Sequence, residues 1–338
     1  MSQYIPFLDD PIPGREPGGI GETEKWWVER QEALEQAGYM LRPRFRPGWK
    51  PSWTGTNKQY LDFEDGNGIR VGVDILSMNS AFCLWYQMRL GMDATRISDG
   101  RPVMLKKLPK EEGPHELEIS KLFSAEALAS DPRNHCVRLL DVIELPDDPP
   151  IIVHPLLRPF ADPLFQTYGE FVTFFSHTIH AREPRRSPVC RHRPHIPFSD
   201  MAYTRDCTYG NMMLDPSNMF PESFHPTVID RSKDFRRKAK WYSRTHRPTR
   251  YFLIDFGLSR RYDPANGPPL DLPIRGGDKS APEHQDRTTL CNPFQTDVYH
   301  LGNVIREDFM QVYTFLSFQH TALTDKLRNI KGLSSWNH

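Results

Sequence analysis

The stretch that most constrains the fold of this chain spans residues 251–257, Tyr-Phe-Leu-Ile-Asp-Phe-Gly. Its four apolar or aromatic residues predict a buried strand that delivers Asp255 at its end. A carboxylate at a strand end, followed two residues later by Gly257, suits a metal-bound phosphate better than it suits an apolar core. So short a pattern also occurs as an ordinary structural turn. Its meaning therefore depends on the residues that stand before and after it.

Length and composition predict a large globular protein with many irregular connections. The chain has 338 residues, a formal net charge of zero and 31 prolines, which is above average usage. A neutral chain gives no overall electrostatic reason to expect nucleic acid or an anionic membrane as partner. No apolar run reaches the roughly 18 residues of a membrane span, no secretory signal is expected, and the five cysteines form no C-x-x-C pair. We expect an intracellular protein, cytoplasmic or nuclear.

Residues 1–60 predict an N-terminal extension with one amphipathic helix. Apolar residues recur at near-helical spacing across 22–37, and Gly38 is a typical stop. Residues 1–21 and 43–56 are broken by proline and glycine, so we expect irregular chain on both sides of this helix.

Residues 61–157 predict a small β-rich unit. The patterns in chain order are a strand at 69–73, a hairpin of two strands within 88–107 around a Ser-Asp-Gly turn, a helix at 116–128, and strands at 135–144 and 151–153. The second hairpin strand ends at Lys106, and the helix carries Glu118. A lysine in this place is more often solvated than functional.

Residues 158–338 predict a larger unit with irregular segments. A proline-rich crossing at 155–160 marks the boundary, and a helix is expected at 169–179. The segment 180–200 has many Arg, His and Pro residues without a period. The zinc candidates in and beside it are His177, His180, Cys190, His192 and His195. Their spacing matches no ligand template, so an irregular basic loop is the favoured interpretation over a metal site.

The polar loop at 205–211 gains meaning from its place before Asp255. Asp206 stands five residues before Asn211, which places a carboxylate and an amide oxygen on one turn. Phosphoryl transfer needs such a pair, because the carboxylate orients and deprotonates the attacking hydroxyl while the amide helps to hold Mg²⁺. Asp255 would then supply the main metal ligand. Lys106 would hold the nucleotide phosphates, and Glu118 would hold Lys106 through an ion pair.

These residues belong to an ordered set. In chain order the set is Lys106, Glu118, Asp-x4-Asn at 206–211, Asp-Phe-Gly at 255–257, Ala-Pro-Glu at 281–283 and Asp-x4-Gly at 297–302. Over about 90–309 the chain resembles the eukaryotic protein kinase superfamily, and the resemblance is closest to uncharacterised kinase-like proteins of mushroom-forming fungi. It implies an α+β, two-lobed protein-kinase-like fold. The N-lobe would be small and β-rich, and the C-lobe mainly helical and truncated, with an irregular 180–200, a basic insert at 215–250 and an incomplete C-terminus.

The resemblance also implies an activity and its residues. The chain would be an ATP- and Mg²⁺-dependent protein kinase with a protein substrate. By residue, Asp206 would be the base, preceded by Arg205; Lys106 and Glu118 would position phosphates; Asn211 and Asp255 would hold the metal; and Met104 and Met213 would sandwich the adenine. Asp297 would brace the catalytic loop, and Leu122, Thr204 and Phe256 would stack into a column between the lobes.

Departures from the family pattern leave other functions open. No G-x-G-x-x-G precedes Lys106, Thr208 stands where the family has a phosphate-binding lysine, and no arginine is recognisable as the partner of Glu283. A catalytically impaired pseudokinase that acts as a binding scaffold is therefore the main alternative. A small-molecule phosphotransferase is disfavoured, because Ala-Pro-Glu and Asp-x4-Gly are typical of peptide-binding kinases.

The segment after Asp255 predicts how Arg205 is satisfied. Residues 263–279 contain no Ser, Thr or Tyr, so phosphorylation in the middle of this loop is not expected. Asp271 or Asp278 could instead serve as a fixed anion for Arg205.

The stretch 231–250 carries nine Arg or Lys residues. Such charge runs are more often solvated surface. The alternative is a docking site for an acidic partner, with nucleic acid disfavoured and no membrane contact expected.

Overall fold

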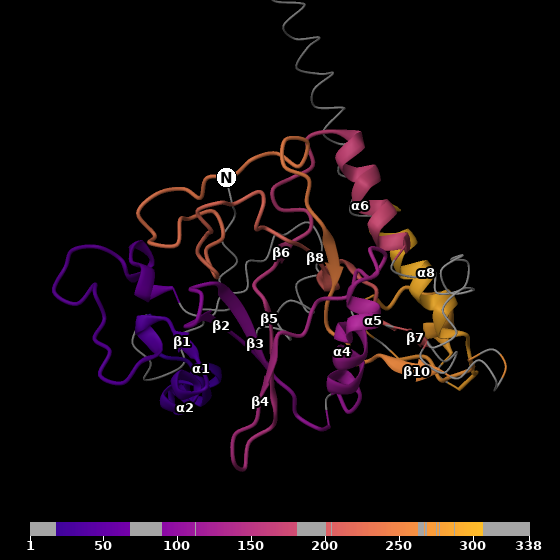
Figure 1. The fold of residues 1–338 in the computed structure, drawn as a ribbon, viewed down its shortest axis with the longest axis horizontal. Helices are drawn as coiled ribbons and strands as arrows, with labels where there is room; N and C mark the ends of the chain where they lie inside the picture. The colour runs from indigo at the N-terminus through magenta and orange to yellow at the C-terminus, as the bar shows by residue number, and fades with distance from the viewer. Residues whose placement is uncertain are drawn as a thin grey trace, which may run out of the picture.

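The computed structural model describes residues 18–67, 90–111, 113–180, 201–203, 205–262, 267, 269–274, 276, 278–286 and 288–306. Within these residues the protein is a mixed α/β structure built on antiparallel sheets, in agreement with the predicted α+β class (Figure 1). The strand predicted at 69–73, most of 180–200 and Thr204 lie outside the described residues. None of the described helices is long and apolar enough to cross a bilayer.

The largest sheet of the described chain has five antiparallel strands in the order β1-β2-β3-β5-β4. The strands are β1 Tyr39–Leu41, β2 Gly91–Arg96, β3 Pro102–Lys107, β4 Asp141–Ile143 and β5 Ile151–Pro155. The predicted hairpin within 88–107 is confirmed as β2 and β3. Its turn needs Gly100, because the backbone there has φ +69°, a region that side chains disfavour. The strand predicted at 135–144 is shorter than expected.

One face of this sheet is covered by the N-terminal helices. Val103 and Leu105 alternate along β3 and are fully buried, as are Trp27 of α1 (Glu22–Val28) and Leu34 of α2 (Gln31–Gln36). The single helix predicted at 22–37 is thus wrong. The chain breaks at Arg30, whose guanidinium donates two hydrogen bonds to Asp148 of the β4–β5 turn. The extension also supplies β1, so it is part of the sheet.

The helix predicted at 116–128 is also divided. Helix α4 (Glu116–Ser124) ends at Ala125, which is extended, and α5 (Glu126–Ala129) follows. Side chains from outside the helix fix this break: Asn134 donates to the carbonyls of Phe123 and Leu128, and the Ser124 hydroxyl accepts from the amide of Leu139. Backbone groups that a longer helix would use are satisfied by these contacts instead.

A second hydrophobic core lies around a three-stranded sheet, in the order β6-β8-β9. Its elements and neighbours are β6 Arg158–Pro159, α6 Tyr168–His180, β7 Met201–Tyr203, β8 Met212–Leu214, β9 Tyr251–Leu253, β10 Arg260–Tyr262 and α8 Pro293–Asn303. The strand predicted before Asp255 and the helix predicted at 169–179 are confirmed as β9 and α6. Phe174 of α6 packs its ring on Tyr251 of β9, with both buried.

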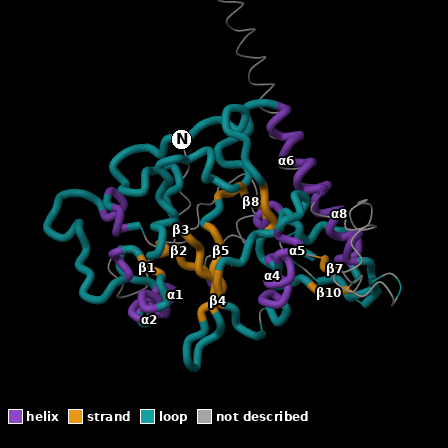
Figure 2. The backbone as a smooth tube through the Cα atoms, viewed as in Figure 1, coloured by secondary structure: helices purple, strands orange, loops and turns teal. Residues whose placement is uncertain are grey.

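The expectation of a mainly helical second half is wrong for the described residues. There, α6 and α8 are the only α-helices, and loops make up most of the rest (Figure 2). Four prolines fall within 215–250, and proline cannot continue a helix or donate to one. The described residues also form short 3₁₀ turns: η2 Pro43–Phe45, η3 Tyr60–Asp62, η4 Glu64–Gly66, η6 Tyr209–Asn211 and η8 Pro282–Gln285.

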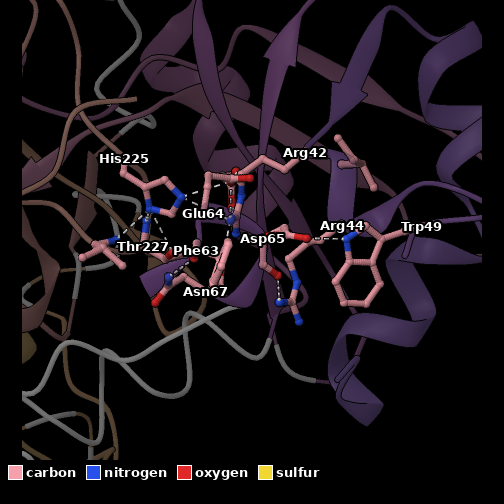
Figure 3. Close-up of polar contacts among 12 residues, drawn as sticks. Arg42, Arg44, Trp49, Phe63, Glu64, Asp65, Asn67, His225 and Thr227 are labelled. Atoms are coloured by element: carbon pink, nitrogen blue, oxygen red, sulfur yellow. Dashed lines mark hydrogen bonds and ion pairs between the residues drawn. The ribbon is translucent and has the colours of Figure 1, made fainter. Parts of the chain in front are cut away.

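A buried polar cluster joins the N-terminal extension to the insert at 215–250 (Figure 3). Arg42 donates to both carboxylate oxygens of Asp93 on β2, at 2.8 and 3.1 Å, and its Nη1 lies 3.2 Å from Glu64 Oε1. The fully buried His225 comes from the insert, and its Nε2 lies 3.2 Å from the same Glu64 oxygen. His225 Nδ1 accepts from the amide of Val228, so Nε2 carries the proton and donates to Glu64.

We predict that Glu64→Gln lowers the free energy of unfolding by about 1–2 kcal/mol at pH 7, because it removes a charged acceptor. Burial raises the pKa of Glu64, but the hydrogen bond from His225 and the charge of Arg42 outweigh it, so the net shift is downward. The stabilisation is therefore present above the unfolded pKa, about 4.3, and is lost as pH falls through the lower folded pKa. Urea unfolding from pH 7 to pH 3 should show the two proteins converging below about pH 4.

Glu22→Gln is the matched control, because Glu22 is exposed on α1 and pairs only with Lys25 of the same helix among the described residues. It should leave stability unchanged across the range. A wild-type advantage over Glu64→Gln that persists undiminished at pH 3 would contradict the assignment of charge to Glu64.

Candidate functional site

Lys106 stands at the centre of the candidate site. Along β3, Val103 and Leu105 face α1 and α2, and Lys107 lies over the Trp26 ring on that side. Strand alternation turns Lys106 to the opposite face. There its amine is buried, 2.6 Å from Glu116 Oε1 and 2.9 Å from Asp255 Oδ1. The expected meeting of Lys106 and Asp255, 149 residues apart, is confirmed.

The carboxylate that holds Lys106 is Glu116, so the prediction of Glu118 is wrong. Glu116 is 3% exposed, while Glu118 is exposed and pairs with Arg261 at 2.6 Å. Two residues along a helix turn a side chain by about 200°, which places Glu118 on the outer face. The buried face of α4 runs through Glu116, Ile119 and Ser120.

The sequence contained a signal that points to Glu116. Spacings of three and four residues mark one helix face. Ile119 follows Glu116 by three residues and Phe123 follows Ile119 by four, and both apolar residues pack into the second core. Phe123 also takes the place expected for Leu122, because its ring centroid lies 5.8 Å from that of Phe256.

Charge balance explains why a lysine can be buried here. Burial would lower the pKa of Lys106, but attraction to Asp255 and Glu116 outweighs it, so the pKa is raised and the amine stays charged. Burial raises the pKa of Glu116, and the nearby charge of Asp255 adds to this, while Lys106 opposes it. The backbone amide of Phe256 also acts to lower the pKa of Glu116. Glu116 therefore senses both Lys106 and the Asp-Phe-Gly backbone.

The backbone around Asp255 is turned sharply after β9. Asp255 has φ +60°, an unfavourable region for a residue with a Cβ. Two contacts fix the turn: the amide of Ile254 donates to the carbonyl of Asn211 at 3.0 Å, and the amide of Gly257 donates to Asp255 Oδ1 at 3.2 Å. Phe256 is buried in the second core. The strand therefore delivers Asp255 toward Lys106 while Phe256 anchors the turn.

Asp206 and Asn211 meet as the sequence predicted. The side-chain nitrogen of Asn211 donates to the carbonyl and to Oδ2 of Asp206, both at 2.9 Å. Asn211 is buried and Asp206 half-buried. Because the amide hydrogens of Asn211 are directed to Asp206, its oxygen is directed elsewhere. Together with the bond from Ile254, this joins the loop at 205–211 to the Asp255 turn.

Arg205 is neutralised by Asp271, as one of the two sequence alternatives proposed. Its Nη2 lies 2.5 Å from Asp271 Oδ2, and Arg205 is buried. Asp271 is held by two backbone hydrogen bonds to Cys291. Asp278, the other alternative, instead accepts from Asn303 of α8 and from Ser280.

Gly276 lies close to Asp206. A Cβ on Gly276 would lie 2.3 Å from Asp206 Oδ1, so a larger residue there would displace the Asp206 carboxylate. This contact was not foreseen, and no local pattern distinguishes Gly276 from other loop glycines.

The remaining predicted residues are only partly tested. Met104 is half-buried against the second core, on the same face of β3 as Lys106. Met213 lies between the buried Met212 and Leu214 on β8, so it points away from that core. The adenine-binding role of both residues stays a prediction. Glu283 accepts from the Thr296 hydroxyl, and Asp297 is buried on α8, which contacts β7.

The donor set suits Mg²⁺ in type. A carboxylate from Asp255 and an amide oxygen from Asn211 are hard oxygen ligands, and Mg²⁺ in nucleotide sites is held by one or two such groups together with phosphates and water. Among the described residues no three His, Cys, Asp or Glu side chains gather as a metal site. The zinc candidates at 181–200 lie outside these residues, while His177 stacks on His135.

Comparison with known proteins assigns no family to this chain. Neither a scan against protein-family models nor a search of the curated proteins found a match for this chain.

Proposed function

We propose that this chain is a protein kinase that transfers phosphate from Mg-ATP to a protein hydroxyl. The observation that carries this proposal is the buried Lys106 amine held between Glu116 and Asp255. These three residues come from a strand, a helix and a post-strand turn, so their convergence is not a local accident of sequence. A positive group at this point is suited to bind nucleotide phosphates.

A two-lobed kinase-like arrangement is supported by the cores and by the strand order. Two separate clusters of buried apolar residues are present, one around the five-stranded sheet and one around β8, β9 and α6. Lys106 comes from the first sheet, and Asp255 follows the second. Helix α4 lies in sequence between β3 and β4 and supplies Glu116. A nucleotide site between two such units is the proposed consequence.

The residues can be given roles from their contacts. Lys106 would bind phosphate oxygens while Glu116 keeps its amine in place. Asp206 would accept the proton of the substrate hydroxyl at its carboxylate, which Asn211 orients. Asp255 and the oxygen of Asn211 would hold Mg²⁺, which when bound neutralises charge on the transferred phosphate. Asp255 would then exchange part of its contact with Lys106 for the metal.

The second candidate is a pseudokinase scaffold, and Thr208 is the observation that favours it. Thr208 is 5% exposed and carries no positive charge, so it cannot replace the phosphate-binding lysine that the kinase resemblance implies at this position. The sequence also lacks the glycine-rich loop before Lys106. A scaffold would keep the Lys106 cluster as structure and would not bind Mg-ATP.

Nucleotide binding and transfer can be separated by two substitutions. Wild type should be stabilised by Mg-ATP by about 2.7 kcal/mol at a hundred times its Kd, and Lys106→Met should lose this shift relative to its own nucleotide-free form. Asp206→Asn should keep the stabilisation by Mg-ATP, because Asp206 does not contact the Lys106 amine. In a phosphorylation assay with a generic protein substrate it should lose activity by about 10²–10⁴-fold.

Lys121→Met on the exposed side of α4 is the control for Lys106→Met and should behave as wild type. Absence of any Mg-ATP shift in well-folded wild type would favour the scaffold. Residual phosphorylation that is equal in wild type, Lys106→Met and Asp206→Asn would exclude the enzyme.

The Glu116 assignment is tested by a matched pair two residues apart. Glu116→Gln should lower kcat/KM by about 10–100-fold, because it removes a charged hydrogen bond to Lys106. Glu118→Gln should stay within about twofold, since an exposed ion pair contributes little. Steady-state kinetics with Mg-ATP varied gives both values. A larger loss in Glu118→Gln than in Glu116→Gln would reverse the assignment.

The Arg205–Asp271 pair should matter without any phosphorylation. Asp271→Asn keeps the shape of the side chain but removes the charge opposite buried Arg205, so we expect activity to fall about tenfold or more. Asp278→Asn serves as the comparison, because Asp278 contacts Ser280 and Asn303 rather than Arg205, and it should fall less. Equal activity of both variants and wild type would rule out a fixed anion.

A further inference from the structure

The loop at 231–242 displays cations and aromatic rings on a fixed backbone. His225 N donates to the carbonyl of Arg231, Ala239 N donates to that of Asp230, and Tyr242 N donates to that of Met219, all at 2.8–2.9 Å. Ser232 closes the turn between, since its amide donates to the carbonyl of Arg237 at 2.8 Å. The stretch is thus held in one conformation, unlike a freely solvated charge run.

Buried anchors tie this loop to the second core. Arg244 is 6% exposed; its guanidinium donates to the carbonyl of Phe160 at 2.7 Å and lies over the Phe165 ring. The amide and hydroxyl of Thr245 both donate to Glu170 of α6. Arg244 therefore has a structural role, whereas the cations at 231–240 are exposed and available to a partner.

Several of these charges are uncompensated among the described residues. Glu222 pairs with Arg237 and Lys240, which reduces their contribution. Arg231, Lys233 and Lys238 have no ion-pair partner in the described chain. The side chain of Arg236 is 86% exposed, and its Nε lies 3.9 Å from Asp234 Oδ2, which is a long ion pair. Arg231 and Lys238 are bridge partners, so their side chains share one side, with Lys233 and Arg236 on the turn between them.

Two large aromatic residues follow directly. Trp241 is 41% exposed and Tyr242 is 46% exposed. Exposed Trp and Tyr next to Arg are the residues that most often dominate binding at protein interfaces. The exposed part of the Trp241 ring is apolar surface in contact with water, and an apolar side chain of a partner would cover it.

We propose that Lys233, Arg236, Lys238 and Trp241 form a docking surface for an acidic polypeptide segment with an apolar residue among its carboxylates. The carboxylates would meet the turn cations, and the apolar residue would pack on Trp241. This surface shares no residue with the Lys106 cluster, and the proposal does not depend on phosphate transfer.

Single-stranded nucleic acid fits this surface less well. Such binding needs successive free ring faces and a continuous basic track. Arg247 already lies 4.3 Å over the Tyr242 ring, and Glu222 interrupts the cations between Arg237 and Lys240. The chain also has no net positive charge.

Fluorescence anisotropy on the full chain tests this surface. The probe is a labelled ten-residue peptide of glutamates around a central leucine. The triple variant Lys233→Glu, Arg236→Glu and Lys238→Glu should weaken binding by about tenfold or more, with a smaller dependence on salt. Trp241→Ala should also weaken it, by about tenfold, with the salt dependence kept.

Lys50→Glu, Lys58→Glu and Lys110→Glu together make the same change in net charge at exposed positions elsewhere. This control should bind the peptide within about twofold of wild type. An equal loss in the control triple would show non-specific charge attraction and overturn the site. Tighter binding of a ten-nucleotide oligothymidylate than of the peptide would replace the acidic segment with nucleic acid. No binding of the peptide by wild type up to about 1 mM, the weak end of specific affinities, would also overturn it.

Discussion

The buried amine of Lys106 is the interaction on which the arrangement of this molecule most depends. A charged amine out of water is costly by several kcal/mol unless opposite charges replace its solvent. Glu116 and Asp255 do so at 2.6 and 2.9 Å, and each comes from a different part of the chain. Strand β3, the start of α4 and the turn after β9 must therefore be placed together, because misplacing any one would leave an uncompensated charge in the interior.

Features set by local chemistry could be predicted from the sequence. The β2–β3 hairpin follows from alternation around a Ser-Asp-Gly turn, and β9 follows from an unbroken apolar run. The Asp206–Asn211 contact needs only one short loop, so spacing was enough to find it. The Arg205–Asp271 pair was one of two predicted alternatives. Residues 263–279 contain no Ser, Thr or Tyr to carry a phosphate, so Asp271 or Asp278 was expected to supply the anion, and Asp271 does.

Features decided by distant residues could not be predicted in the same way. Helix α4 stops where Asn134 and Leu139 engage its last turn, and α1 stops where Arg30 reaches Asp148. The choice between Glu116 and Glu118 depends on which face of α4 meets Lys106. Helix spacing identifies that face only when the apolar residues of α4 that are buried are already known. Strand β1 pairs with β2 across about fifty residues, and no local pattern specifies such a pairing.

The cluster around His225 shows why the insert is part of the fold. Asp93 lies on β2, next to the strand that carries Lys106, and it is held through Arg42 and Glu64 to His225 of the insert. Removing the insert would leave Glu64 without its histidine donor beside a buried arginine, at a cost to the same sheet that presents Lys106. The outer side of the insert, with Lys233, Arg236 and Lys238, takes no part in this cluster. The charges proposed for docking are therefore carried by residues other than those that hold the insert to the sheet.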